Sequence, residues 1–156
     1  MKRRFPMGNH AIMDYSRITT RIFLGTNACC RRHFDLKLLR RGITADISLE
    51  EERIDAPRGV DYFLWLPTKD HTAPTQKDLE LGSQVIDWCL RHRERVYIHC
   101  KNGHGRSPTL LAAYLIRYQG RSVHRAIAAI KRRRPEIHLE PKQQNALMAF
   151  ARHEPS

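Results

Sequence analysis

The chain has no hydrophobic segment long enough to span a membrane, because nowhere do 18 apolar residues follow one another. Residues 1–6 (MKRRFP) are basic, and the start of the chain lacks the apolar core of a secretory signal peptide. A reactive thiol, which we expect at Cys100, also favours a reducing compartment. From these features we predict a cytoplasmic protein.

Internal repeats and low-complexity linkers are absent as well. Hydrophobic residues make up 41% of the chain, so its composition does not predict disorder. A length of 156 residues suits one domain with a buried core. We predict one folded domain over residues 14–153, preceded by a loose segment at 1–13.

The four cysteines do not form a metal-binding pattern. Cys29 and Cys30, followed by His33, make a poor frame for zinc, and no second pair completes it. These two cysteines either pack in the ordinary way or approach Cys100 and trap it as a reversible disulfide. Cys89 lies on the apolar side of a helical pattern and is predicted to be core. We predict neither a metal nor a cofactor.

Acidic residues are few, since 16 Asp and Glu stand against 28 Lys and Arg, and the formal net charge is +12. Basic side chains crowd the stretch 117–134. They are Arg117, Arg121, Arg125, Lys131, Arg132, Arg133 and Arg134. This stretch either attracts an anionic substrate or surface, or is a solvated face that aids solubility. The sequence lacks a zinc finger or an aromatic-and-basic stacking motif, so nucleic acid is not a predicted partner.

The most informative segment is 99–107 (HCKNGHGRS), which lies between an apolar run at 96–98 and a helix-like run at 109–117. This order predicts a strand, a tight loop and a helix N-terminus, where backbone N–H groups form a nest for an oxyanion. The helix dipole favours the thiolate of Cys100 at the same place. Arg106 is expected to hold two phosphate oxygens as a planar fork.

Each position of this loop has a chemical use. Its two glycines can adopt positive φ and leave the backbone bare beside an anion. The predicted phosphate-binding residues are Lys101, Asn102, Gly103, His104, Gly105 and Arg106. Ser107 is expected to hydrogen-bond the sulfur and ease its departure from a phosphocysteine. His99 is expected to order the loop through backbone hydrogen bonds. A Walker A loop is excluded, because no Lys-Ser/Thr follows a G-x4-G frame.

Strand-like and helix-like segments alternate along the chain. The strands are expected at 21–24, 43–47, 61–66 and 95–99, and the helices at 33–41, 76–92, 108–118, 123–133 and 142–152. The alternation predicts a single α/β domain with a mostly parallel central sheet flanked by helices. In such a fold the 99–107 loop lies at the C-terminal edge of the strands.

The 99–107 segment resembles the signature H-C-x2-G-x2-R-S/T of the cysteine-dependent protein tyrosine phosphatases, and the compact chain resembles their dual-specificity branch. The similarity extends to DYSRIT and RIFLG in 14–25, to LPTKDHTAP at 66–74, and to RRP at 133–135 followed by Gln143. Together these segments cover about residues 14 to 150. The resemblance implies the compact fold of that branch and a phosphatase activity that needs no metal.

A carboxylic acid is the second group that this chemistry needs, first to protonate the leaving oxygen and then to deprotonate water. Asp70 lies in a loop thirty residues before Cys100, and the resemblance places the family's general acid there. Asp78 is a poorer candidate, because the pattern at 75–78 is typical of a helix cap. In some members of the branch a glutamine positions the hydrolytic water, and Gln143 fits that spacing better than Gln144.

The resemblance implies that the substrate is phosphotyrosine, phosphoserine or phosphothreonine in a protein. Basic residues at the positions of Lys101 and His104 are seen in related phosphatases of polyphosphorylated lipids, so a phosphoinositide or another polyanionic phosphate, including an RNA 5′ end, is the alternative. Residues 101–102 lack the Thr-His pair of the RNA 5′-phosphatase branch. A non-catalytic phosphate- or nucleic-acid-binding module is a remote alternative, because a pure binder has no need of both a nucleophile and an acid.

Overall fold

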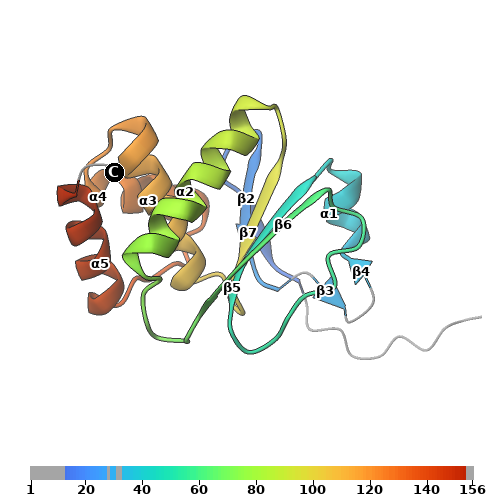
Figure 1. Ribbon diagram of the computed structural model, residues 1–156, viewed down its shortest axis with the longest axis horizontal. Helices are drawn as coiled ribbons and strands as arrows, with labels where there is room; N and C mark the ends of the chain where they lie inside the picture. The colour runs from blue at the N-terminus through green and yellow to red at the C-terminus, as the bar shows by residue number, and fades with distance from the viewer. Residues whose placement is uncertain (1–12, 28, 31–32, 154–156) are drawn as a thin grey trace, which may run out of the picture.

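A five-stranded sheet forms the centre of the computed structural model, which describes residues 13–27, 29–30 and 33–153 (Figure 1). The strand order is β1-β2-β7-β5-β6, with β1 antiparallel to β2 and every other pair parallel. The strands are β1 (Tyr15–Arg17), β2 (Ile22–Gly25), β5 (Ala45–Glu50), β6 (Tyr62–Thr68) and β7 (Val96–His99). A separate two-stranded sheet pairs β3 (Cys29–Cys30) with β4 (His33–Phe34). The predicted α/β class with a mostly parallel sheet is confirmed.

The inner strands β2, β5 and β7 are buried along their whole length, because helices cover both faces of the sheet. Successive side chains of a strand point to opposite faces. In β7, Val96 and Ile98 therefore pack into the larger core cluster, while Tyr97 packs with Phe23 and Leu38 in the smaller one.

The larger core lies between the sheet and four helices, which Figure 1 shows together on one side of it, with α1 on the other. The four helices on the side of the larger core are α2 (Gln76–Arg91), α3 (Arg106–Gln119), α4 (Val123–Arg133) and α5 (Pro141–Arg152). Helix α1 (Leu36–Arg40) lies on the other side. The cap of α2 is Thr75, which accepts a hydrogen bond from the Asp78 N–H at 3.1 Å. Asp78 thus belongs to a helix cap, as its sequence pattern indicated. Ser122 caps α4 in the same way, and Pro141 opens α5.

Several elements differ from the sequence-based expectation: β5 was expected at 43–47 and spans Ala45–Glu50, β3 and β4 were not expected, and three further differences have a clear physical reason. The helix expected at 33–41 begins only after β4, because Asp35 caps α1 by accepting the N–H groups of Lys37 and Leu38. Strand β6 continues through Pro67, which an edge strand tolerates because the missing N–H faces away from the ladder. Helix α3 begins two residues earlier than expected, at Arg106, and this shortens the loop before it.

Among the described residues, no helix combines the length and the apolar character needed to cross a bilayer. Of the segment expected to be loose, 1–13, residues 1–12 lie outside the described residues, whereas Met13 packs against the smaller core cluster. The side chains of Cys29 and Cys30 also lie outside the described part of the chain. Cys89 is confirmed as a core residue of α2. Burial raises the pKa of its thiol to about 11, so it stays protonated at neutral pH.

Candidate active site

The loop at 100–105 leaves the C-terminal end of β7 and runs directly into the first turn of α3. The sequence predicted this strand–loop–helix arrangement, and the structure confirms it. Helix α3 has a glycine at its N-cap, Gly105, and no side chain caps it. The N–H groups of its first turn are therefore not occupied by an N-cap side chain and lie beside the loop, which is the geometry of an anion nest.

The Cys100 side chain is 3% exposed, and its sulfur has polar partners. The Sγ atom lies 3.3 Å from the Ser107 Oγ and accepts a hydrogen bond from the Gly103 N–H at 3.2 Å. Burial alone raises the pKa of the Cys100 thiol, but the Ser107 hydroxyl and amide, the Arg106 charge and the Gly103 N–H together outweigh it and hold that pKa below its usual value. Both predicted features of the sulfur, its polar cradle and its contact with Ser107, are present.

The loop backbone is shaped by a glycine that no other residue can replace without strain. Gly103 has φ +69°, and a Cβ placed there would lie 2.6 Å from backbone atoms of Gly25.

Two carbonyl groups of the loop are turned outward by hydrogen bonds from a fully buried arginine. Arg134 donates from Nε to the Gly103 oxygen at 3.0 Å and from Nη2 to the Asn102 oxygen at 3.1 Å. Because these two carbonyl groups of the loop face Arg134, the inner side of the loop is left to its N–H groups.

Arg106 is buried, with 2% of its side chain exposed, and its guanidinium is held on three sides. Its Nη1 atom donates to the Glu52 Oε2 at 2.9 Å and to the Thr68 carbonyl at 2.8 Å, and Nη2 lies 3.5 Å from the Asp70 Oδ1. The Arg106 hydrogen bond holds the pKa of the Glu52 carboxyl below its usual value. The guanidinium is thus fixed in orientation, as a fork that grips two oxygens needs to be.

Asp70 lies just beyond the end of β6 and faces the same pocket as Cys100, although thirty residues separate them in sequence. The pocket has a volume of about 140 Å³. Its lining residues are Asp70, His71, Cys100, Asn102, His104, Gly105, Arg106, His138, Glu140 and Gln143. The parallel strands bring the two loops to one edge of the sheet, as the sequence predicted.

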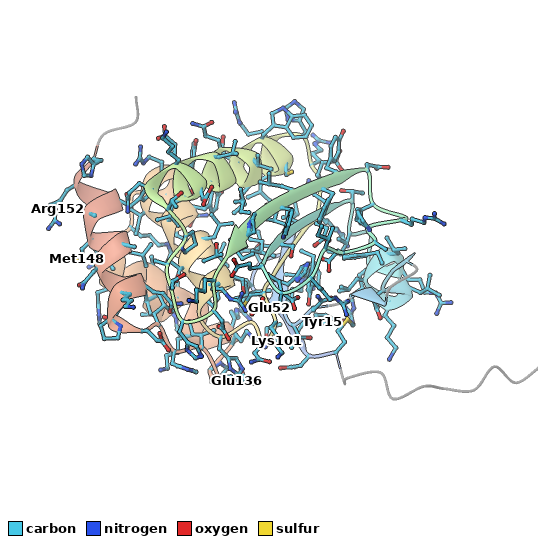
Figure 2. The ribbon with its side chains drawn as sticks, turned by 60° about the horizontal axis from the view of Figure 1, so that its bottom comes forward. Tyr15, Glu52, Lys101, Glu136, Met148 and Arg152 are labelled. Atoms are coloured by element: carbon cyan, nitrogen blue, oxygen red, sulfur yellow. The ribbon has the colours of Figure 1, made fainter. Side chains whose placement is uncertain are left out.

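The remaining predicted site residues differ in where they lie. Gln143 is buried at the start of α5 and lines the pocket, whereas Gln144 is exposed and donates to the Leu139 carbonyl. Lys101 is exposed and does not line the pocket, although its charge helps to lower the pKa of Glu52. Figure 2 shows Lys101 and Glu52 on the same side of the molecule. The phosphate-binding role predicted for Lys101 thus stays a prediction, and its exposed side chain has no contact with the pocket to support it.

His99 differs from its expected role. Its ring is fully buried, and Nε2 lies 2.9 Å from the Asp46 Oδ1 and 2.8 Å from the Asp55 Oδ2. Neither ring nitrogen has a backbone hydrogen bond among the described residues, so the expected backbone contacts of this side chain are wrong. Burial alone lowers the pKa of His99, but the two carboxylates raise it to about 10. His99, which directly precedes Cys100, is thus a buried cation between two acidic side chains.

Asp46, Asp55 and His99 also offer three ligand atoms within 4.8 Å of one another, which is a possible donor set for a metal ion. The carboxylates already face the Nε2 of a histidine that is charged at neutral pH, so the imidazolium takes the place that a cation would occupy. Absence of a metal stays a sequence-based prediction.

Replacing His99 by glutamine should lower the free energy of unfolding by about 3–5 kcal/mol, because the buried Asp55, whose pKa is held below its usual value by His99, loses its counter-charge. His99 has a folded-state pKa of about 10 against 6.5 for the free side chain, so its contribution is complete below pH 6.5 and is lost as pH rises toward 10. The difference between wild type and variant, measured by urea unfolding, should therefore shrink between pH 6.5 and 9.5. A difference independent of pH would contradict the buried cation.

The sequence pointed to most of the pocket but missed several residues that hold it together. The missed residues are Asp46, Glu52, Asp55, Thr68 and Arg134, and in the pocket lining His138 and Glu140. One signal was available for Asp46, because a charged residue stood in an otherwise apolar run that predicted a buried strand. For the others the sequence carried no local signal, since each acts on a segment far away in the chain.

The basic stretch at 117–134 is not one solvated face. Arg117 donates to the carbonyl groups of Phe150 and His153 and lies over the Phe150 ring at 4.3 Å. Arg134 is buried beneath the 100–105 loop. Arg117 and Arg134 thus have partners inside the fold, and the exposed basic surface of the 117–134 stretch is smaller than the sequence indicated.

The family model named "Dual specificity phosphatase, catalytic domain" matches residues 22–153. The chain belongs to this family. The resemblance to the dual-specificity branch of the cysteine-dependent protein tyrosine phosphatases is thereby confirmed, and the matched residues cover every strand of the sheet except β1, together with the 100–105 loop and the helices described above.

Two relatives within the family act on a lipid phosphate by name. The human "Phosphatidylglycerophosphatase and protein-tyrosine phosphatase 1" is 40% identical over 91 residues, which are 56% of this chain and 44% of that protein. The Arabidopsis thaliana "Phosphatidylglycerophosphate phosphatase PTPMT2" is 33% identical over 90 residues, 57% of this chain and 40% of that protein. The chain spans less than half the length of these curated relatives.

Solved structures of family members superpose over nearly the whole chain. The structure of PTPMT1 in complex with PI(5)P has a TM-score of 0.76 and 31% identity, and covers 88% of this chain and 94% of that one. Human DUSP28 has a TM-score of 0.77 at 24% identity, covering 87% and 94%, a likeness of fold.

Proposed function

We propose that this protein hydrolyses phosphate monoesters through a phosphocysteine intermediate. The observation that carries the proposal is the convergence of the Cys100 sulfur, the Arg106 guanidinium and the Asp70 carboxyl on one pocket. The residues come from two segments, since Asp70 lies thirty positions before Cys100, which shares its segment with Arg106, and a site that only binds phosphate has no need of an acid beside a lowered-pKa thiol. Family membership supports the same chemistry.

In the first step the Cys100 thiolate attacks phosphorus, so that an S–P bond forms and the P–O bond to the leaving group breaks. The loop N–H groups and Arg106 hold the equatorial oxygens, where most of the catalysis is expected to arise. Asp70 gives its proton to the leaving oxygen. The charge on the transferred group is balanced by donors that are already in place and need not reorganise.

In the second step water attacks phosphorus, the S–P bond breaks, and inorganic phosphate leaves. Asp70, now a carboxylate, takes a proton from the attacking water. The Ser107 hydroxyl, 3.3 Å from the sulfur, stabilises the departing thiolate. Gln143 lies at the pocket beside Gly105, where it is suited to orient the water.

We propose further that the substrate is the phosphomonoester of an anionic phospholipid head group. The lipid activities in the names of the human and Arabidopsis relatives support this choice over the protein substrates that the sequence first indicated. The pocket lining includes His71, whose pKa is raised by its hydrogen bond to Glu140 and by the charge of Asp70, so this ring brings positive charge to the pocket. Burial and the Arg134 charge lower the pKa of His104, which also lines the pocket. Phosphotyrosine in proteins is the second candidate, because the human relative carries that activity in its name as well.

The two candidates predict different rankings of kcat/KM. We expect mixed micelles containing phosphatidylglycerophosphate or a phosphoinositide to be hydrolysed at least about tenfold more efficiently than a phosphotyrosine peptide, which is about 1.4 kcal/mol of transition-state binding. Malachite-green detection of phosphate measures both. Vanadate should inhibit turnover and a chelator should leave it unchanged. A higher kcat/KM for the peptide would reverse the choice of substrate but leave the phosphocysteine chemistry intact.

A further inference from the structure

The start of α5 touches the loop that carries Asp70. The Nδ1 atom of His71 lies 2.7 Å from the Glu140 Oε1, and the Gln143 Nε2 donates to the Thr72 carbonyl at 3.1 Å. These contacts join segments about seventy residues apart in sequence. They anchor the two residues that follow Asp70, and the anchored loop faces the pocket.

The loop around Asp70 is a tight turn with an unusual conformation. His71 has φ +62°, in the left-handed region that side chains other than glycine rarely adopt. Its N–H donates to the Asp70 Oδ1 at 3.0 Å, and the Thr72 N–H donates to the Lys69 carbonyl at 3.1 Å. The position of the Asp70 carboxylate is therefore tied to the backbone of His71, and the His71 ring is tied to Glu140.

The segment before α5 is also joined to the 100–105 loop. The His138 N–H donates to the His104 carbonyl at 3.0 Å, and a Cβ on Gly105 would lie 2.9 Å from the Gln143 amide. One segment, 138–143, thus contacts the loop of the thiol and the loop of the acid. It sets the separation between the group that attacks phosphorus and the group that protonates the leaving oxygen.

We propose that Glu140 is a positioning residue, which acts through His71 to hold Asp70 where it protonates the leaving group. The inference rests on the proposed phosphatase function. The charged groups that face His71 are Asp70 and Glu140, which favour its protonated form, and the more distant Arg106, which opposes it. The pKa of His71 is accordingly raised, so more of the ring is a cation at neutral pH.

The size of the expected effect follows from exposure. The His71 side chain is 77% exposed, and an exposed ion pair contributes little to global stability. Loss of the contact is therefore expected to loosen one turn rather than unfold the domain. We expect a fall in acid-dependent turnover of about threefold to fivefold.

The variant Glu140→Ser tests this inference, because serine is a good N-cap for α5 but does not reach His71. We expect kcat/KM for phenyl phosphate, whose leaving group needs a proton, to fall about threefold to fivefold. For 4-nitrophenyl phosphate, a better leaving group, kcat/KM should change by less than about 1.5-fold. In an Asp70→Ala background the same change should have no effect on either substrate, because the group that Glu140 positions is gone.

Two further variants serve as checks. His71→Asn breaks the contact from the other side, with a residue that tolerates positive φ, and should give the same substrate-dependent loss. Glu136→Ser removes an equal charge from an exposed position two residues before the 138–143 segment and should leave the hydrolysis of both substrates unaffected. Figure 2 labels Glu136 at the edge of the molecule, below the labelled Lys101. Equal losses on both substrates, or a loss that persists without Asp70, would overturn the inference.

A readout that does not depend on turnover separates this inference from the proposed function. The Thr72 amide should exchange with solvent faster in Glu140→Ser than in wild type or Glu136→Ser, because its turn has lost an anchor. If wild type shows no vanadate-sensitive hydrolysis, the proposed function fails but the exchange measurement still tests the contact. Unchanged exchange at Thr72 would overturn the positioning role.

Discussion

Replacing Cys100 by serine should abolish turnover, with a loss of kcat on the order of 10⁴-fold or more. The sulfur is the atom that forms the bond to phosphorus, and its cradle lowers the pKa of a thiol into reach of neutral pH. A serine hydroxyl starts from a far higher pKa and has no adjacent base, so the same cradle leaves it protonated. Steady-state hydrolysis of 4-nitrophenyl phosphate measures the loss.

The matched control is Cys89→Ala, which removes a buried thiol of α2 whose pKa is raised to about 11. This variant should lose stability through the small cavity but keep kcat. Cys100→Ser should also give no burst of product and no labelled phosphoenzyme after acid quench. Full activity in the serine variant would end the phosphocysteine mechanism.

Replacing Arg106 by lysine should lower kcat/KM by about 10²- to 10³-fold, although the charge is kept. Guanidinium presents two parallel N–H groups in a fixed plane, whereas ammonium is a single point. Arg106 also donates to Glu52 and to the Thr68 carbonyl, and a lysine cannot satisfy both while it reaches phosphate. The loss should appear in kcat as well as KM, because the equatorial oxygens are held most tightly in the transition state.

Vanadate affinity gives a second measure of the same loss, since the trigonal-bipyramidal oxyanion uses the same fork. Arg133→Lys is the control, because Arg133 is exposed at the end of α4 and carries the same change of chemistry outside the pocket. If Arg106→Lys retained wild-type kcat/KM and vanadate affinity, the planar fork would have no part in the reaction.

The sequence predicted the residues that are adjacent to the chemistry, because a loop between a strand and a helix is encoded locally. Cys100, Arg106 and Ser107 lie within eight positions, and each has a chemical reason to stand where it does. The helix cap at Thr75 is local as well, and it formed as expected. Where the propensities of neighbouring residues determine the local structure, the sequence-based prediction of that structure is correct.

The sequence did not predict what supports those residues, because the support comes from distant segments. Glu52 contacts Arg106 across 54 positions, and Arg134 contacts the loop carbonyls across 31 or 32. Arg134 was read as part of a basic surface, since a buried arginine and an exposed one look alike in a run of cations. The prediction of backbone partners for His99 was wrong for the same reason, because its actual partners, Asp46 and Asp55, lie on other segments.

The place of Arg134 in the chain has a consequence for biosynthesis. A nascent polypeptide that has left the ribosome only as far as α3 already contains the thiol, the arginine fork and the acid, yet it lacks the guanidinium that turns the loop carbonyls outward. That guanidinium also reaches back to Asp14 and Ser16 at the start of the fold. On the proposed function, competence for catalysis is therefore acquired only after Arg134, at the end of α4, has been synthesised and has packed against the loop.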